Sequence, residues 1–417
     1  MLNDTGLAGT ENAGAEQVPG AADIRKRVRD LLDSHDPAST PKLDFLRAQF
    51  DAGLAWVHYP PGLGGLSLSR VLQPIVDAEL AAAGAPTHNP RRIGIGLGMA
   101  APTILAFGSP EQQQRWLRPL WTGEEVWCQL FSEPGAGSDL ANLATRAVRE
   151  GAGEDGAGGT WTVNGQKVWT SIAHEARWAI LVARTDPSVP KHAGLSYFVL
   201  DMTQPGVEVR PLRQITGEAE FNEVFLTDAT IPDGDRLGAV GDGWRVAMAT
   251  LMNERVSIGG GSLPREGGMI GSAVATWREQ PQLRTPGLHD KLLRLWVDAE
   301  VARLSGVRLR QQLAAGQPGP EGSAAKVVFA RLNQEISGFE VELAAGDGLV
   351  YDDWTMRRPE ATDFYGRDPG FRYLRAKGNS IEGGTSEILR NIIAERVLGL
   401  PPEIRVDKDR AWKDLPR

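Results

Sequence analysis

The sequence predicts a multidomain α+β protein whose parts follow the order helical, β, helical. Apolar residues recur at helical spacing over about 22–125 and again over 238–417. Residues 126–237 instead carry short apolar runs separated by glycine, proline and aspartate, which is typical of strands and turns. With 417 residues the chain is long enough for two or three such domains.

The first helical block contains one helix whose ends are marked clearly in the sequence. In the stretch "SPEQQQRWLRPLWTG", Ser109 is suited to cap the helix and Pro110 to occupy its first turn. Gly123 is a typical residue for ending it. Before this block, residues 1–21 lack the basic and apolar regions of a signal peptide, so we expect a flexible polar tail.

The middle block contains the stretch "TWTVNGQKVWTS", residues 160–171. It alternates apolar and polar residues around Asn164-Gly165, a dipeptide strongly associated with hairpin turns, and therefore predicts a β-hairpin. The Gly-rich, acidic segment 150–159 predicts a mobile loop. Further strands are expected in 178–186, 195–202, 207–213 and 222–231.

The last block, residues 238–417, predicts long helices. Helical periodicity runs through 243–258, 288–316, 322–346 and 385–399. Glycine- and proline-rich breaks separate the first three of these segments.

Composition excludes several classes of partner. The net charge is −8 and the pI about 5.5, so nucleic acid and anionic membranes are poor candidates. Cys128 is the only cysteine, which fits a reducing compartment and predicts a cytoplasmic protein. No apolar run approaches the roughly 18 residues that a membrane helix needs. No metal site is expected.

Several segments, in this order, resemble motifs of the acyl-CoA dehydrogenase family. They are "PPGLGG", "FGSPEQQQRWL", "WCQLFSEPGAGSDLANLATRAV", "VNGQKVWTSIAHEARWAILVAR", "GDGWRVAMATLMNERV" and "IEGGTSEILRNIIAERVLGLP". The resemblance covers nearly the whole chain from about residue 25. It implies an N-terminal α-helical domain, a middle β-barrel or sandwich domain, and a C-terminal four-helix bundle. The implied activity is FAD-dependent α,β-dehydrogenation of an acyl-CoA, as in fatty acid β-oxidation, with electrons passed to an electron-transfer flavoprotein.

The turn "SEPGAGSD" has a composition that suits a ligand site. Glycines and small hydroxyl residues expose backbone N–H groups that can face an anionic or strongly hydrogen-bonding group. An ordinary turn between a helix and a strand is the alternative. By resemblance, the flavin would be lined by Gln129, Leu130, Phe131, Ser132, Ser138, Trp169, Thr170, Ser171, Thr385 and Glu387. A Ser171 hydroxyl would lie near flavin N5, and Ser138 would also lie on the CoA side.

The reaction needs a carboxylate base for the α-proton. Many family members carry it in the C-terminal signature, but alignment on Thr385 places Gly383 at that position. A second group of the family carries the base on a helix just before an arginine, which here matches Glu254-Arg255. Glu254 is therefore the expected base, with a buried ion pair or a solvated position as its structural alternative. Glu382 is the second candidate base, and a favourable place near a helix N-terminus is its alternative.

The resemblance also implies how the thioester is held. The backbone N–H of Gly383 would bind the thioester oxygen, because that role needs no side chain. Gly384 belongs to the same turn, and Arg255 would support the CoA-side wall or orient the base.

The segment expected to hold the FAD adenosine departs from the family pattern. The usual Arg-x-x-Phe-Gly motif is absent, and Arg278 or Arg284 remains a possible substitute. Glu342 stands where the family often has glutamine. Such departures occur in members that work as mixed complexes. A homodimer or homotetramer is expected, with a hetero-oligomer as the alternative.

Two alternative functions remain open. One is a flavin oxidase or monooxygenase on the same scaffold, and the other is a subunit without activity.

Overall fold

The computed structural model forms two compact units, Met1–Trp127 and Cys128–Arg417. The described residues are 19–151, 158–259, 264–314, 322–351, 353–361 and 367–416, without the side chains of 255–259 and 313–314. The expected polar tail, apart from its last residues, and most of the expected loop at 150–159 therefore lie outside the described residues.

The first unit is helical. Its α-helices are α2 (Ala21–Ser34), α3 (Lys42–Asp51), α4 (Gln73–Ala82), α5 (Pro90–Ile95), α6 (Ala101–Phe107) and α7 (Pro110–Thr122). The predicted ends of α7 are confirmed: the Ser109 hydroxyl accepts from Gln112 N, and Gly123 ends the helix at φ 77°. Fully buried apolar side chains of α2, α3 and α4, among them Ile24, Phe45 and Val76, form one core.

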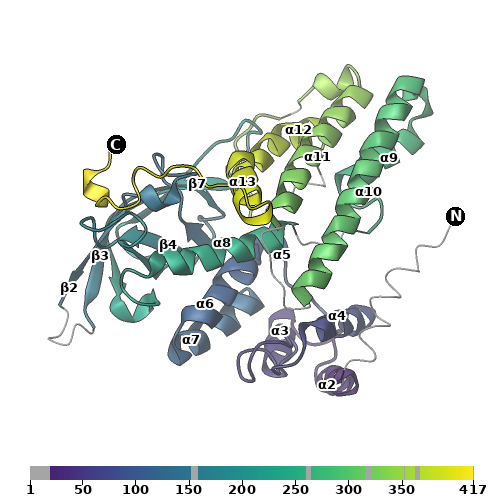
Figure 1. The fold of residues 1–417 in the computed structure, drawn as a ribbon. Coiled ribbons are helices and arrows are strands. Elements are labelled where there is room, and N and C mark those ends of the chain that lie inside the picture. Colours follow the sequence, from purple (N-terminus) through teal and green to yellow (C-terminus); the bar gives the residue numbers. More distant parts are fainter. Residues whose placement is uncertain are drawn as a thin grey trace. The chain divides into compact units, whose positions relative to one another are not determined.

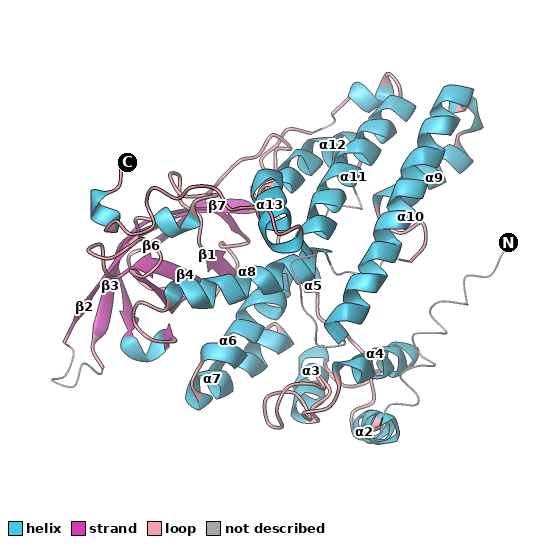
Figure 2. Cartoon of the chain, in the orientation of Figure 1, coloured by secondary structure: helices cyan, strands magenta, loops and turns pink. Residues whose placement is uncertain are grey.

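The second unit begins with a twisted, mostly antiparallel sheet, shown in magenta in Figure 2. Its strands are β1 (Trp127–Leu130), β2 (Arg146–Glu150), β3 (Thr160–Ser171), β4 (Trp178–Arg184), β5 (Leu195–Asp201), β6 (Val207–Pro211), β7 (Phe221–Pro232) and β8 (Arg236–Leu237). The strand order is β6-β7-β3-β2-β4-β5-β8, with β1 paired to β4. The predicted strands after residue 178 are thus confirmed.

The predicted hairpin at Asn164-Gly165 is wrong. Residues 160–171 form one continuous strand, β3, and the dipeptide lies at a register shift where β3 pairs with β7. Asn164 exchanges two hydrogen bonds of 2.9 Å with Asp228 of β7. A Cβ at Gly165 would come within 2.4 Å of the Thr145 hydroxyl oxygen, so the glycine permits a close strand approach rather than a turn.

The second unit continues with α8 (Gly243–Gly259), α9 (Met269–Glu279), α10 (Pro286–Ala314), α11 (Gly322–Leu343), α12 (Pro369–Ala376) and α13 (Ser386–Ile392). Figure 1 shows α9, α10 and α11 as neighbouring helices, and their buried side chains share one core. Helix α8 packs both on α11 and on β5. The expected fold class is confirmed. Among the described residues, no helix is long and apolar enough to cross a membrane.

Candidate flavin and thioester site

The turn "SEPGAGSD" is fixed to the sheet by a buried ion pair. Glu133 lies in this turn, and its carboxylate accepts from the ammonium of Lys167 on β3 at 2.9 Å. The same carboxylate accepts from Ala144 N at 2.7 Å and Thr145 N at 2.9 Å. Lys167 is fully buried and also donates to the carbonyls of Phe131 and Val182. Every donor of this ammonium is thereby satisfied, which buried charges require.

The pKa shifts of this pair follow from burial and mutual attraction. Burial lowers the pKa of the Lys167 ammonium, and the Glu133 carboxylate opposes that shift. For Glu133, burial alone would raise the pKa, but Lys167 and the hydrogen bonds outweigh it and hold the pKa below the ordinary value. The pair is therefore charged within an apolar surrounding, and it orders the loop that follows β1.

The residues around this loop that are predicted to contact the flavin differ in how exposed their side chains are. Leu130 and Phe131 are buried in the molecule, so only their backbone groups could reach a ligand. Gln129 and Ser132 are half-buried, and Ser138 is exposed. Added Cβ atoms on Gly135 and Gly137, which lie within this turn, would meet no atom within 4 Å beyond their chain neighbours. The loop thus presents backbone to open space.

Trp169 occupies an unusual backbone position at the end of β3. Its φ is 62°, at a second register shift between β3 and β7, and its ring is 58% exposed. The ring meets Phe221 edge to face at 5.8 Å. A bulge that turns a large aromatic ring outward from a strand is a common device beside ligand sites.

Thr170 and Ser171 follow the exposed tryptophan. The Thr170 hydroxyl is buried and has no hydrogen-bond partner within the described part of the chain. Ser171 is half-buried. An exposed aromatic face, a buried hydroxyl without a partner and an open glycine-lined backbone fit the polar edges and flat face of an isoalloxazine ring.

The C-terminal signature forms a tight turn before α13. Gly383 and Gly384 have φ values of 64° and 94°, a left-handed conformation that glycine adopts without strain. The Thr385 hydroxyl accepts from Ile388 N at 3.2 Å and caps α13. Glu387 is exposed and lies 3.9 Å from Arg390. Glu387 thus faces solvent from the first turn of the helix.

Glu382 is held in a structural network. Its carboxylate accepts from the Arg375 guanidinium at 2.9 Å and also from Asn379. Arg375 in turn donates to Glu220 at 2.9 Å, and both of these residues are nearly fully buried. Arg375 also lies over the Phe221 ring, which itself touches Trp169. This network joins the signature turn to the sheet and to the exposed tryptophan.

Glu254 lies near the end of the described part of α8. The helix face that carries it is anchored one turn earlier, where the Thr250 hydroxyl is within 3.0 Å of the Tyr197 hydroxyl of β5. Ala247, two turns before Glu254 on the same helix face, is fully buried, and Glu254 itself is half-buried. The side chain of Arg255 lies outside the described residues.

Lys326 of α11 holds the signature turn through a buried hydrogen bond. Its ammonium donates to the Gly384 carbonyl at 2.7 Å, and its side chain is 1% exposed. Burial lowers the pKa of Lys326, while the charges of Glu382, Glu254 and Glu387 oppose that shift. Helix α8, which carries Glu254, also packs on α11, so that α11 adjoins both α8 and the signature turn.

In the structure, the charged residues of the segment expected to hold the FAD adenosine are paired within the chain. Glu342 is paired with Lys291 of α10, so its charge is compensated. Arg278 donates to Glu266, and Arg284 donates to the backbone carbonyls of Trp277 and Arg278. Both candidate arginines therefore have partners within the chain.

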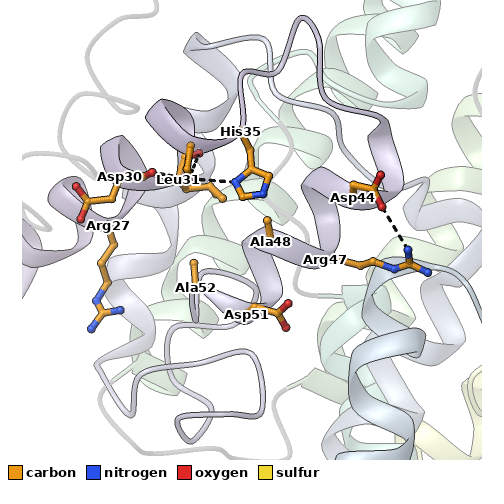
Figure 3. Close-up of a pocket in the computed structure, with 10 residues that line it drawn as sticks. Arg27, Asp30, Leu31, His35, Asp44, Arg47, Ala48, Asp51 and Ala52 are labelled. Carbon is orange, nitrogen blue, oxygen red and sulfur yellow. Dashed lines mark hydrogen bonds and ion pairs between the residues drawn. The ribbon is translucent and has the colours of Figure 1, made fainter.

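A pocket in the first unit lies between α2 and α3 (Figure 3). Its volume is about 470 Å³, and its lining includes His35, the ion pair of Asp44 with Arg47, and Arg27 at another part of the pocket. None of the predicted site residues lines it.

Comparison with known proteins places the chain in a family. Models of the acyl-CoA dehydrogenase N-terminal, middle and C-terminal domains match residues 21–124, 128–229 and 241–398. The chain belongs to the acyl-CoA dehydrogenase family, whose members are FAD-dependent oxidoreductases. The expectations of family, enzyme class and cofactor are confirmed at this level.

Similar proteins include acyl-CoA dehydrogenases of Mycobacterium tuberculosis. FadE34 is 42% identical over 84% of this chain, and IpdE1 is 38% identical over 85% of it. The chain spans 45% of the length of FadE34 and 86% of that of IpdE1. Among solved structures, the Tcur3481-Tcur3483 steroid ACAD has a TM-score of 0.70 at 23% identity, covering 96% of this chain and 98% of its own. A chain of the ChsE4-ChsE5 complex from Mycobacterium tuberculosis has a TM-score of 0.67 at 26% identity, covering 92% and 98%.

Sequence reasoning did not identify Lys326, Arg375 or the Glu133–Lys167 pair. For Lys326 a signal was present, because it shares a helix face with Ala330, Asn333 and Ser337, all of them buried. A lysine on the inner face of a helix needs a buried partner.

Proposed function

We propose that the chain catalyses the FAD-dependent α,β-dehydrogenation of an acyl-CoA thioester and passes the electrons to an electron-transfer flavoprotein. Bound FAD would supply an acceptor at N5 for the hydride that leaves the β-carbon. The chain's own residues would take the α-proton, hold the thioester oxygen and exclude water.

In this proposal Glu254 removes the α-proton. The partly buried position of Glu254 suits a base, since exclusion of water raises the proton affinity of a carboxylate. The backbone N–H of Gly383 would bind the oxygen on which negative charge develops. Ser138 and Arg255 would contact the CoA side. Glu382 is a less suitable base, because Arg375 holds its charge in an ion pair.

The observation that supports this assignment most strongly is that α8, which carries Glu254, packs on α11, while Lys326 of α11 donates to the Gly384 carbonyl of the signature turn. A base and an oxyanion donor must flank the same carbon atom, so they must come from neighbouring elements. The arrangement of α8, α11 and the signature turn supplies such neighbours.

A panel of acyl-CoA thioesters tests the function. We expect anaerobic addition of a suitable thioester to bleach the flavin of the purified protein, and an electron-transfer flavoprotein or artificial acceptor to sustain turnover. A bleached protein that reoxidises in air with rapid consumption of oxygen would instead support the oxidase or monooxygenase alternative. If the flavin stays oxidised with every straight, branched and ring-bearing thioester, the proposed function is wrong.

We further propose that the chain works as an oligomer that uses an apolar face of α10. Leu293, Val297, Val301 and Leu304 are each about half exposed and recur at intervals of three or four residues, so they share one helix face. Contiguous exposed apolar residues of this kind are typical of protein interfaces. A related chain belongs to the ChsE4-ChsE5 complex, which makes a second type of subunit a specific alternative to self-association.

Charged substitutions on this face are expected to dissociate the assembly. The double variant V297D/V301D should have a smaller mass by light scattering and retain less flavin, because desolvating two carboxylates opposes association. V240D changes a similarly exposed valine outside the helix and should leave the mass unchanged. An unchanged mass for the double variant would exclude α10 as the interface.

A further inference from the structure

The chain segment that follows α13 is exposed until it reaches one buried tryptophan. Residues 396–406 are all exposed, and Ile404 among them is 93% exposed. Trp412 is then buried, at the start of a short 3-10 helix, η9 (Trp412–Asp414). Figure 1 shows this part of the chain, in yellow, running from α13 to the sheet. Residues 407–415 are termed the strap here. Because no side chain is buried over 396–406, the position of the strap depends on the contacts that it makes itself.

Backbone hydrogen bonds place the strap along the connection between β4 and β5. Trp412 N donates to the Val189 carbonyl at 2.9 Å. Lys413 N donates to the Pro187 carbonyl at 3.0 Å. The strap therefore runs beside this connection in a defined register.

Arg184 of β4 links the strap to the loop that follows the turn "SEPGAGSD". It is 2% exposed, and its guanidinium donates to the carbonyls of Ala141 at 2.6 Å and Leu143 at 3.0 Å. The guanidinium lies 4.3 Å from the centre of the Trp412 ring, and the indole N–H donates to the Asn142 carbonyl at 3.3 Å. Neutral carbonyls compensate a buried charge less well than a carboxylate does, and an aromatic face contributes most where the cation is desolvated. Trp412 thus binds the loop directly and also supports the guanidinium that binds it on either side.

Lys191 makes a second link, between the turn itself and the strap. Its ammonium donates to both carboxylate oxygens of Asp139, the last residue of "SEPGAGSD", at 2.8 and 3.0 Å. The same ammonium lies 2.6 Å from a carboxylate oxygen of Asp407, the first residue of the strap. Two carboxylates that share one cation repel each other when the cation is removed. Lys191 therefore draws the turn and the strap together.

We propose that Lys191 and Trp412 are positioning residues through which the strap fixes the ligand-facing turn. The inference rests on the proposed function, in which Ser138 and the backbone of this turn face the flavin and the thioester. Lys191 holds the residue next to Ser138, and Trp412 holds the loop that follows it. Glu133 and Lys167 fix the start of the same turn, so the strap fixes its other end.

A purely structural role makes a different prediction. If Trp412 and Lys191 only completed the fold of the sheet, their loss would loosen β4 and β5 and would have no selective effect on residues 134–143. Hydrogen exchange of the backbone amides, read by mass spectrometry, separates the two roles because it reports each segment by itself. The rate of flavin release from the flavin-loaded protein, followed by flavin fluorescence after dilution, reports the consequence for the cofactor.

Four variants and one control test the two links separately. K191M removes the shared cation, and K191R keeps it. W412A removes both the ring and its N–H, whereas W412F keeps a ring over Arg184 without the N–H. I404A shortens an exposed side chain just before the strap and is the matched control. All are prepared as the flavin-loaded full chain.

In K191M and W412A we expect faster exchange confined to residues 134–143. Flavin release should be faster by roughly tenfold, since each variant removes a contact made by a charged group. K191R and W412F should lie between these variants and the wild type, and I404A should match the wild type. If W412A fails to fold, K191M still decides the point, because it leaves Trp412 in place.

Two results would overturn the proposal. One is unchanged exchange of residues 134–143 in folded K191M and W412A. The other is faster exchange there with an unchanged rate of flavin release, because the turn that the strap orders would then not hold the cofactor. Neither measurement needs a substrate. A wild type that turns over no thioester would therefore overturn the proposed function and leave the test of the strap intact.

Discussion

The Glu254→Gln variant is expected to lose roughly 10²- to 10⁴-fold in kcat while retaining its flavin. Glutamine has the same shape as glutamate but cannot accept a proton, so the loss reports chemistry rather than packing. Because Glu254 is half-buried and follows the anchored face of α8, the substitution should not disturb the helix. KM should change less than kcat.

The measurement combines steady-state turnover with anaerobic flavin reduction in a single turnover. In E254Q, reduction of the flavin by the best thioester should slow by the same factor as kcat, since proton abstraction precedes or accompanies hydride loss. Flavin content and melting temperature should remain at the wild-type values. A variant with full turnover would remove Glu254 from the mechanism.

Glu382→Gln is the matched control, because it neutralises the other candidate carboxylate. Removing the charge of Glu382 takes one ion-pair partner from the buried Arg375, which keeps Glu220 as its other partner. We therefore expect a lower melting temperature and a change of less than about tenfold in kcat. The opposite pattern, with E382Q inactive and E254Q active, would transfer the role of base to Glu382.

Local signals in the sequence predicted local structure well. The capping residues of α7 and the apolar runs of β4 and β5 depend on neighbouring residues, and they appear where expected. Asn164-Gly165 misled the prediction, since the same dipeptide suits a hairpin turn and a bulge. Only the approach of Thr145, the residue before β2, decides between them.

The candidate site could be proposed from the sequence as separate segments, but the arrangement of their side chains could not. Motif resemblance located Trp169 and the signature turn, whereas the backbone bulge that exposes the Trp169 ring follows from pairing with β7. Likewise, Lys326 and Arg375 act through partners distant in the sequence, and a single sequence does not specify such pairings. Glu382 looked like a possible base until its contact with Arg375 was known.

The second large effect is expected at the ion pair beneath the turn "SEPGAGSD". Replacing Lys167 with methionine leaves Glu133 as a buried carboxylate without its cation and leaves the Phe131 carbonyl without this donor. Breaking a buried pair from one side destabilises a protein by about 3–5 kcal/mol. We expect K167M to lose this much free energy of unfolding in urea titrations.

The same variant should lose flavin, because the turn that we propose to face the cofactor is fixed through Glu133. The ratio of flavin to protein after gel filtration measures this directly. A control is available on β6, where Glu208 and Arg210 form an exposed pair, and E208Q should change neither flavin content nor stability measurably. Full flavin retention in a folded K167M would contradict the link between the pair and the cofactor.

The acid dependence of stability provides an independent check on Glu133. Its pKa in the folded protein is held below the ordinary value, net of burial, by Lys167 and its hydrogen bonds. Such a group stabilises the fold above its unfolded pKa and loses that contribution as the pH falls through the folded pKa. The stability difference between wild type and E133Q should therefore be present at neutral pH and shrink in acid.

A double-mutant cycle then separates the pair from its surroundings. E133Q alone leaves the fully buried Lys167 charge uncompensated, so it should be about as destabilising as K167M. The double variant K167M/E133Q buries no charge, and it should recover part of the lost stability. The two single losses would then exceed the loss in the double variant, and the difference is the coupling within the pair. If the pair exists chiefly to order the cofactor turn, flavin retention will stay low in the double variant even where stability returns. Recovery of both together would mean that the pair acts on the cofactor only through the overall stability of the sheet.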